Sequence, residues 1–263
     1  QNPDNKVLIL EAGSKDKYLR TKIPVGYLFS MGSPKTDWCY TTEKEIGLNG
    51  RSLNYPRGRV LGGSSAINGM IYMRGQAKNY DHWKSEGNTG WGWDDVLPYF
   101  KKSEDHFNGA DDFHGEGGAW RVEQQRLSWE VLDSFAEACT QSGIPPTEDF
   151  NRGTNFGVGY FEVNQRKGVR VSADSAFLKP IRHRKNLTII TNANVEKITF
   201  EGKKAIGVIF QKDKKSTPVP FYVKARCEVI LSAGSINTPK ILQLSGIGSP
   251  NLLKGFGIDV IHS

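Results

Sequence analysis

The sequence contains no long apolar segment and few cysteine residues. No apolar run reaches the ~18 residues that a membrane-spanning helix requires, so we expect no transmembrane segment. The N-terminal residues QNPDNKVLIL lack the basic stretch and apolar core of a signal peptide. The three cysteines are far apart and form no C-x-x-C motif, which argues against a zinc site or a redox dithiol. We expect Cys39, Cys139 and Cys227 to be buried free thiols in a reducing compartment.

Motifs of several common enzyme classes are also absent. The sequence has no H-E-x-x-H metal motif, no G-x-S-x-G nucleophile elbow and no Walker or G-x-G-x-x-G loop, so a hydrolase receives little support. Histidine is a natural general base, but none of the five lies in a recognisable catalytic context. We therefore expect each of them to be a surface or structural residue. They are His82, His106, His114, His183 and His262.

The charge balance is basic but not concentrated in one place. Lys and Arg number 35 against 28 Asp and Glu, which gives a net charge of +7. The densest cluster, 212-KDKKS-216, lies between two strand-like segments, and we interpret it as a solvated hairpin turn rather than a binding patch. No homeodomain, zinc-finger or RRM pattern accompanies it, so we expect no nucleic-acid partner.

A continuous apolar run opens the chain. The segment 6-KVLILEAG-13 has the length and composition of a buried parallel strand. Glu11 stands at its carboxyl end, where an acidic side chain can bond the ribose hydroxyls of a dinucleotide. It can equally be a helix cap or an exposed strand end. Residues 14–54 predict loops and extended structure, with a strand-like segment at 36-TDWCYTTE-43.

The most distinctive segment is 55-YPRGRVLGGSSAINGMIYMRG-75. Gly62 and Gly63 allow the backbone to approach a ligand closely, and the two serines after them offer hydroxyl groups. From Ala66 onward a helix can begin, and backbone N–H groups at its N-terminus would favour an anion. Two upstream arginines, Arg57 and Arg59, add positive charge. The segment is either an anion-binding loop or a tight turn between two buried elements.

Three helices are predicted between residues 79 and 143. The segment 79-NYDHWKSEG-87 indicates a short helix, and 94-DDVLPYFKKSEDHF-107 indicates a second one with Asp94 as its N-cap. The clearest helix is 128-SWEVLDSFAEACTQSG-143, with Ser128 as its cap. Its apolar stripe consists of Val131, Leu132, Phe135, Ala136 and Cys139.

Strands dominate after residue 187. They are predicted at 187–191, 194–200, 205–211 and 218–225, with hairpin turns at 201–204 and 213–216. A further buried strand is predicted at 227–234, followed by a helix that Asn237 or Thr238 caps with Pro239 in its first turn. The Ala233–Gly234 turn between them either approaches a ligand or only packs the strand on the helix.

These elements predict a mixed α/β (α+β) fold. A parallel sheet is crossed by an antiparallel β-meander, and a helical, loop-rich insertion separates the two. We expect one domain to begin in residues 1–78 and to be completed by 171–263, with 79–170 as the insertion.

Three segments taken together resemble a known family. KVLILEAG, YPRGRVLGGSSAINGMIYMRG and SAGSINTPKILQLSGIGSP are similar, in order and spacing, to the glucose–methanol–choline (GMC) family of FAD-dependent oxidoreductases. The last two resemble the two signature patterns of that family. The resemblance covers nearly the whole chain and is closest in character to choline dehydrogenase-like proteins and bacterial alcohol dehydrogenases. Further matching stretches are TDWCYTTE, NYDHW, GWGWDDVLPYFKKSED, FHGEGG and SADSAFLKPIRHRKNLTIITNANVEKI.

The resemblance implies an FAD site. It places Glu11 at the adenosine ribose, the backbone of Val195 at the adenine, and Ala233 and Gly234 near the dinucleotide. Along the pyrophosphate and ribityl chain it places Arg59, Gly62, Gly63 and Ser64. Near the isoalloxazine ring it places Asn68, Gly69, Met70 and Ile71. Some members carry a flavin-linked histidine at the position of Ile67, so the resemblance implies a non-covalent FAD here.

Two departures from the family pattern concern the ends of the sequence. The G-x-G-x-x-G turn of the family is expected before Gln1, and its proton-abstracting histidine is expected after Ser263. We therefore expect an internal fragment with an incomplete FAD-binding domain (1–78 and 171–263), a lid and substrate-side insertion (79–170), and no catalytic residue. An isolated fragment of this kind should be unstable, because the strand at 7–10 would leave an open sheet edge.

The resemblance also implies a function. We expect an FAD-dependent dehydrogenase that takes hydride from the CH–OH group of a small alcohol such as choline and passes electrons to a separate acceptor other than NAD. Its expected location is cytoplasmic or peripheral to the inner membrane. The alternative is a non-catalytic flavin-binding protein, a decayed or truncated relative of these enzymes.

Overall fold

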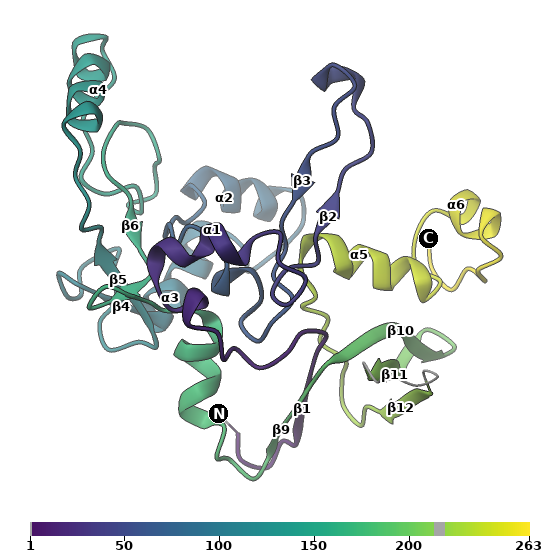
Figure 1. Ribbon diagram of the computed structural model, residues 1–263. Helices are drawn as coiled ribbons and strands as arrows, with labels where there is room; N and C mark the ends of the chain where they lie inside the picture. The colour runs from purple at the N-terminus through teal and green to yellow at the C-terminus, as the bar shows by residue number, and fades with distance from the viewer. Residues whose placement is uncertain (1, 213–218) are drawn as a thin grey trace. The chain divides into compact units, whose positions relative to one another are not determined.

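The computed structural model (Figure 1) describes residues 2–212 and 219–263. The chain divides into two compact units. Unit 1 comprises Gln1–Lys15 and Lys185–Ser263, and unit 2 comprises Asp16–Arg184. Helices occur together with both parallel and antiparallel sheets, which confirms the predicted mixed α/β class. The predicted turn at 213–216 lies outside the described residues.

A parallel pair of strands lies in unit 1. β1 (Val7–Glu11) is hydrogen-bonded to β9 (Leu187–Thr191) along its whole length, so the parallel strand predicted at 6–13 is confirmed. The strand is less buried than expected, since Val7 and Leu8 are 47% and 36% exposed. Among the residues that the structure describes, β1 pairs with β9 alone, and a two-stranded ribbon leaves much of each face uncovered.

The predicted antiparallel meander is also confirmed. Its strands are β10 (Ala193–Glu201), β11 (Lys204–Lys212) and β12 (Pro220–Lys224). Gly202 turns the first hairpin with φ +57°, a conformation that glycine adopts without steric cost. The apolar core of the unit centres on Ile198, Val208 and Ile241, which joins the meander to the helix that follows it.

The strand predicted at 227–234 does not form. Val229 and Leu231 pack against the core while Ile230 is 77% exposed, so the segment is extended but has no ladder partner within residues 2–212 and 219–263. The helix α5 (Gly234–Leu244) begins earlier than the predicted caps Asn237 and Thr238, because the chain turns sharply at Gly234 with φ +86°. Pro239 consequently lies inside the helix rather than near its start. A short helix not predicted from the sequence, α6 (Pro250–Gly255), follows.

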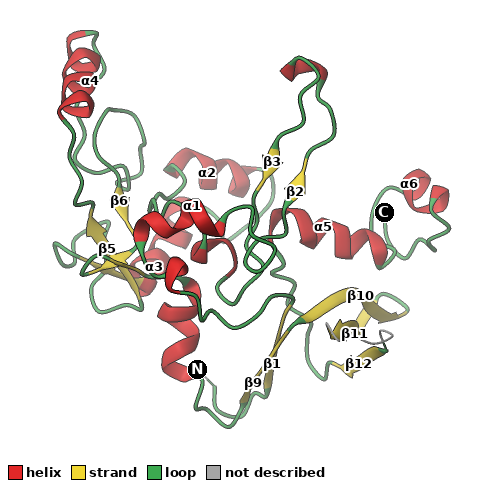
Figure 2. Cartoon of the chain, in the orientation of Figure 1, coloured by secondary structure: helices red, strands yellow, loops and turns green. Residues whose placement is uncertain are grey.

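The first part of unit 2 consists of short elements joined by loops (Figure 2). The predicted strand at 36–43 is reduced to β2, because Cys39 has φ +55° and interrupts the extended backbone. Cys39 and Cys227 are exposed, so the expectation of buried thiols is wrong for these two. The elements are η1 (Leu19–Thr21), η2 (Pro24–Gly26), α1 (Tyr27–Ser30), β2 (Tyr40–Thr41), η3 (Ile46–Leu48) and β3 (Asn54–Tyr55).

The three predicted helices of the insertion are present with different ends. They are α2 (Ala77–Ser85), α3 (Trp93–Ser103) and α4 (Glu130–Gln141). The N-cap of α3 is Gly92, not Asp94, because the carboxylate of Asp95 turns back to accept the Gly92 N–H at 3.0 Å. The N-cap of α4 is Trp129, not Ser128, and its side chain makes no capping bond. The apolar stripe of α4 is largely exposed, with Phe135 at 62%.

A small mixed sheet supports the insertion. The end of the helix predicted at 94–107 is instead a strand, because Glu104 and its neighbours pair with β5 and turn their side chains into a buried polar cluster. The sheet contains β4 (Glu104–His106), β5 (Trp120–Gln124) and β6 (Glu162–Val163). The remaining elements of the unit are η4 (Gly63–Ala66), β7 (Gln165–Arg166), β8 (Val169–Arg170), η5 (Asp174–Leu178) and η6 (Lys179–Ile181).

Replacing Ser245 with alanine should loosen the junction of α5 with β10. The buried Ser245 hydroxyl accepts the Ile198 N–H at 2.8 Å and donates to the Ile241 carbonyl at 2.5 Å. Without it, the Ile198 N–H is left unpaired in the core, at a cost of about 1–3 kcal/mol. Hydrogen exchange at the Ile198 amide should therefore accelerate in Ser245→Ala and stay unchanged in Ser249→Ala, which alters an exposed serine. Equal exchange in both variants would contradict this role.

Candidate functional site

The glycine-rich segment 57–71 forms an irregular loop in unit 2. The helix expected from Ala66 does not form. Instead, η4 ends at that residue, and the chain reverses at Met70, whose φ is +66°. Two glycines are required by the loop itself, because a Cβ on Gly58 would collide with the Gly63 backbone and one on Gly62 would lie 3.2 Å from Asp174. The loop therefore depends on close backbone contacts rather than on regular secondary structure.

Gly69 differs from these residues. A Cβ placed there would meet no heavy atom of the described structure within 4 Å, and its φ lies outside the left-handed range that favours glycine. Gly63 also faces open space, although its φ of +55° accounts for a glycine by itself. The loop thus has a side on which other groups can approach its backbone closely.

Asp37 fixes the beginning of the loop. Its carboxylate is 2% exposed and accepts the backbone N–H groups of Gly32 at 2.6 Å, Cys39 at 3.0 Å and Arg57 at 2.9 Å. The neighbouring Thr36 carbonyl accepts the Arg59 N–H at 2.8 Å. Since Asp37 accepts three amide N–H groups, its carboxylate is held in place inside the protein. Nothing in the sequence pattern indicated this role.

The loop arginines lie over aromatic rings. The Arg57 guanidinium is 4.1 Å from the Tyr55 ring centroid and also donates to the Pro56 carbonyl at 2.6 Å. The Arg59 guanidinium is 5.1 Å from the Trp38 ring centroid. Stacking of this kind restrains a guanidinium on the face of an aromatic ring.

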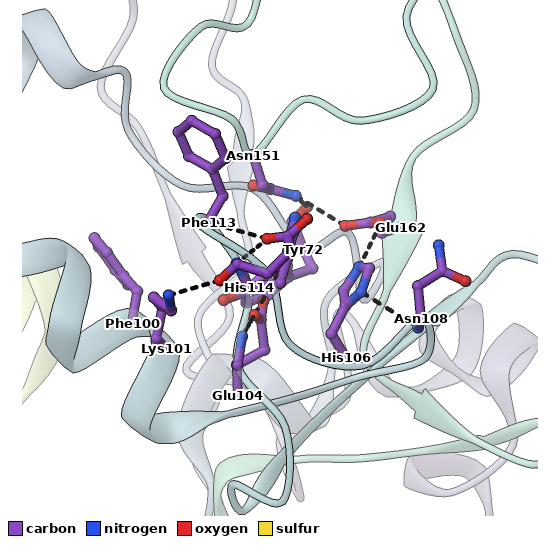
Figure 3. Close-up of polar contacts among 12 residues, drawn as sticks. Tyr72, Phe100, Lys101, Glu104, His106, Asn108, Phe113, His114, Asn151 and Glu162 are labelled. Atoms are coloured by element: carbon purple, nitrogen blue, oxygen red, sulfur yellow. Dashed lines mark hydrogen bonds and ion pairs between the residues drawn. The ribbon is translucent and has the colours of Figure 1, made fainter.

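The end of the loop is tied to the mixed sheet. Asn164 N–H donates to the Met70 carbonyl at 2.8 Å, and Tyr72 N–H donates to the Glu162 carbonyl at 2.8 Å. Next along the chain, the Arg74 N–H donates to Asn151 Oδ1 at 2.8 Å. The Asn151 amide in turn donates to Glu162 Oε2 at 3.0 Å. These bonds join the loop to a buried polar cluster, shown in Figure 3.

An ion pair and two histidines form the centre of this cluster. Arg74 Nη2 lies 2.7 Å from Glu104 Oε1, and both side chains are almost fully buried. His114 places one ring nitrogen 3.1 Å from Glu104 and the other 2.8 Å from Asp149. His106 lies 2.8 Å from Glu162, and its ring stacks on that of His114 at 3.9 Å. Both histidines are structural, as expected, but neither is at the surface.

The charges of the cluster support one another. Burial alone would lower the pKa of His114, but its hydrogen bonds to Asp149 and Glu104 outweigh burial and raise the pKa to about 9. Burial would raise the pKa values of Glu104 and Asp149, but bonds from His114 and from backbone amides lower both, with a further contribution from Arg74 at Glu104. His114 is therefore an imidazolium at neutral pH, held between two carboxylates.

The other predicted site residues of unit 2 also lie in the glycine-rich loop. Ser64, Asn68, Gly69 and Ile71 are exposed, whereas Met70 is 5% exposed and can offer only its backbone to a ligand. The hydroxyl of Ser64 accepts the Gly58 N–H at 3.1 Å. All eight residues predicted for the diphosphate and the ring lie in this one loop. They are Arg59, Gly62, Gly63, Ser64, Asn68, Gly69, Met70 and Ile71.

Four predicted site residues belong to unit 1. Glu11 ends β1, and its Oε1 accepts the Gly13 N–H at 2.7 Å. Val195 lies at a β-bulge, where the pairing of β10 with β11 shifts register and frees backbone groups from the ladder. Ala233 and Gly234 are exposed at the start of α5. β1 and α5 both contact β10, so these residues stand on adjoining elements.

Comparison with known proteins decides the family. The family model described as GMC oxidoreductase matches residues 7–255. The chain belongs to the GMC oxidoreductase family. This GMC chain is 40% identical over 268 residues to mitochondrial choline dehydrogenase of Homo sapiens, covering 99% of the chain and 44% of that protein. It is 40% identical over 255 residues to an oxygen-dependent choline dehydrogenase of Brucella anthropi, covering 97% and 46%.

Solved structures agree with this assignment. The GMC chain superposes on pyridoxine 4-oxidase from Mesorbium loti with a TM-score of 0.92 and 34% identity, covering 100% of the chain and 51% of that structure. An FAD-dependent oxidoreductase from Chaetomium thermophilum gives 0.89 and 32%, covering 100% and 47%. The resemblance inferred from the sequence is confirmed, and the chain spans about half the length of the relatives it matches. No helix within the described part of the GMC chain is long and apolar enough to cross a bilayer.

The His114 network predicts how stability depends on pH. Because the folded pKa of about 9 exceeds the unfolded value of about 6.5, the contribution of His114 is complete below pH ~6.5 and is lost as the pH rises through about 9. The lowered pKa values of Glu104 and Asp149 act in the opposite direction, because their contribution is lost on acidification. Urea unfolding between pH ~6 and ~10 should show a decline of up to about 3 kcal/mol from His114.

A pair of histidine variants isolates this effect. His114→Gln should flatten the alkaline decline, because the group that loses its proton is gone. His82→Gln, at an exposed position, should retain the decline of the unmodified protein. An equally steep decline in His114→Gln would show that other groups cause it.

Proposed function

We propose that this chain forms much of the flavin bed of an FAD-dependent oxidoreductase that acts on the CH–OH group of small alcohols. The observation that carries the proposal is the loop at 57–71, which is tied down by the protein on one side and open at Gly69 on another. The family membership of the chain and its choline dehydrogenase relatives support this assignment.

The residues present fit an FAD molecule. Arg57 and Arg59 supply positively charged side chains beside the glycines, and the carboxylate of the neighbouring Asp37 is held by three backbone amides. The open backbone at Gly63 and Gly69 would let a diphosphate and a planar ring lie against the loop. An electropositive loop with glycines at its open side is suited to a dinucleotide.

Each site residue has a role in this proposal. Glu11 would bind the adenosine ribose, and Val195 would contact the adenine through its backbone. Ala233 and Gly234 would pass close to the dinucleotide. Arg59, Gly62, Gly63 and Ser64 would follow the pyrophosphate and ribityl chain, and Asn68, Gly69, Met70 and Ile71 would support the ring. Ile67 is a buried isoleucine, so the proposed FAD is non-covalent.

The chemistry divides between the cofactor and the protein. Bound FAD would supply the hydride acceptor for oxidation of an alcohol. The residues of this chain would bind and orient the cofactor. Removal of the hydroxyl proton requires a base, and we assign that role to none of the residues 1–263. Choline or another small alcohol as substrate, a separate acceptor other than NAD, and a cytoplasmic or inner-membrane-peripheral location complete the proposal.

Expression of the full-length gene tests the proposal directly. The purified protein should show flavin absorbance, and acid or heat should release the flavin because no covalent bond holds it. Choline and primary alcohols should then bleach the flavin without oxygen. A full-length protein that holds no flavin after refolding with FAD would overturn the proposal. A flavin that no alcohol reduces would favour a non-catalytic flavin-binding relative.

Gly69→Ala should weaken FAD binding without destabilising the fold. The new methyl group meets no protein atom within 4 Å but stands on the open side of the loop. Stability should be unchanged or about 0.4–1 kcal/mol higher, because alanine has less unfolded-state entropy than glycine. FAD should bind at least about tenfold more weakly in titrations followed by flavin fluorescence.

Gly47→Ala provides the matched control for this variant. Gly47 also has open space around its Cβ position and an ordinary φ, but it lies in η3 rather than in the loop. Its alanine variant should match Gly69→Ala in stability and the unmodified protein in FAD affinity. Equal FAD affinity in the two variants would argue against a ligand at Gly69.

Glu11→Gln should also weaken FAD binding. The amide oxygen can still accept the Gly13 N–H, but the negative charge that strengthens a bond to ribose hydroxyls is lost. We expect an increase of about tenfold in the dissociation constant of FAD, measured by titration of the deflavinated full-length protein. Glu201→Gln, at the exposed end of β10, is the control. An affinity equal to that of the control would exclude Glu11 from the site.

A further inference from the structure

A buried arginine holds the glycine-rich loop from the rear. Arg170 ends β8, is 2% exposed, and its backbone N–H donates to the Lys22 carbonyl at 2.9 Å. Its Nη1 donates to the Ser65 carbonyl at 3.1 Å and to Asn68 Oδ1 at 2.9 Å. One guanidinium nitrogen therefore joins the end of η4 to the turn that follows it.

The bond to Asn68 continues into the backbone of that turn. Asn68 Oδ1 also accepts the Met70 N–H at 3.1 Å, and Met70 has the left-handed φ of +66°. A left-handed conformation is unfavourable for a residue with a side chain and persists only where its surroundings hold it. Arg170 orients the Asn68 amide, and the amide in turn holds the Met70 backbone.

A second tie from the same segment reaches the other end of the loop. Ala173 N–H donates to the Ser65 hydroxyl at 2.9 Å, and that hydroxyl donates to the Gly62 carbonyl at 2.5 Å. Residues 170–173 thus contact the loop both at its glycine pair and, through Arg170, at the Asn68–Met70 turn. The loop is fixed from behind while Asn68 and Gly69 stay exposed.

Arg170 carries a full positive charge and has more hydrogen-bond donors than these bonds use. Its Nε and Nη2 are buried and have no hydrogen-bond partner in the described residues. Burial lowers its pKa to about 10, with Asp16 opposing the shift, so the group remains a cation at neutral pH. A neutral donor could make the same bonds to Ser65 and Asn68 at a smaller cost of desolvation. Retaining a full charge here points to a role for the charge itself.

We propose that Arg170 is a positioning residue for the flavin, which sets the conformation of the Asn68–Gly69–Met70 turn and places a fixed positive charge behind it. This inference rests on the proposed function, in which that turn supports the isoalloxazine ring. A cation buried behind the ring acts through protein rather than water, so it is weakly screened. It would favour the negatively charged reduced flavin over the oxidised flavin and so raise the midpoint potential.

Two substitutions in the full-length protein separate the charge from the bonds. Arg170→Met keeps the length of the side chain and removes both. Arg170→Lys keeps the charge but cannot reproduce the planar guanidinium. The measurements are the FAD dissociation constant, the midpoint potential of the bound flavin and, in the deflavinated protein, hydrogen exchange at the Met70 amide. The matched control is Arg166→Met, an exposed arginine four positions away.

The expected results differ for each variant. Arg170→Met should bind FAD at least about tenfold more weakly, shift the flavin potential to a more negative value and expose the Met70 amide to exchange. Arg170→Lys should weaken binding but keep the potential near that of the unmodified protein. Arg166→Met should leave all three quantities unchanged.

Two outcomes would overturn the inference. One is an Arg170→Met protein with unchanged affinity, potential and exchange. The other applies where both Arg170 variants fail to fold and Asn68→Ala is measured in their place. Asn68 is exposed, so we expect this variant to fold. Unchanged FAD affinity and Met70 exchange in Asn68→Ala would then overturn the inference. An unmodified full-length protein that binds no flavin would instead contradict the proposed function.

Discussion

The buried ion pair between Arg74 and Glu104 is the contact on which the surroundings of the loop depend. A buried pair is stable only when the remaining donors and acceptors of both groups are satisfied. Here Arg74 also donates to the Phe113 carbonyl, and the second oxygen of Glu104 accepts from His114 and from the Gly115 amide. The pair therefore fixes, in one place, the end of α3, the turn at 113–115 and the strand-like segment that leaves the glycine-rich loop. Removing either partner would leave a buried charge facing the other groups of the cluster.

This arrangement separates the charges of unit 2 into two regions. Glu104 is paired with Arg74 and with the imidazolium of His114, and Asp149 is paired with His114. Asp37, the buried acid beside the start of the loop, is bound by three backbone amides. Arg170, which contacts the loop, keeps two buried donors without a hydrogen-bond partner in the described chain. Arg57 and Arg59 lie in the loop and Arg170 contacts it, so three cationic side chains border the segment proposed to hold a diphosphate.

Local patterns were sufficient to predict the parallel strand and the meander, because apolar periodicity reports directly on which faces are covered. The segment 227–234 shows the limit of that reasoning. It has the composition of a buried strand, but a strand also needs a hydrogen-bonded neighbour, and composition does not show one. The N-cap predicted for α3 was wrong because the carboxylate that accepts the Gly92 N–H belongs to Asp95, and composition does not distinguish Asp95 from Asp94. The contacts that position the site could not be predicted from local patterns, because they join residues far apart in the sequence. His106 and Glu162 are 56 positions apart, and Arg170 and Asn68 are 102 apart. Nothing in the residues of the segment 113–118 indicated a buried His114.

For some residues of the glycine-rich loop, contacts within the protein explain why that residue type occurs there, and for others they do not. Gly58 is needed because the Gly63 backbone leaves no room for a side chain, and Gly62 because its φ is +93°. The Asn68 oxygen and the Met70 side chain are engaged inside the unit, by Arg170 and by the core. Gly69 has neither a steric nor a conformational reason to be glycine, and Ile71 beside it leaves a large apolar side chain 49% exposed. An open glycine beside an exposed isoleucine also occurs at Gly47 and Ile46, so these two features alone do not indicate a ligand. That both features occur next to the turn that Arg170 holds is most simply explained by a planar, partly apolar group lying against this side of the loop.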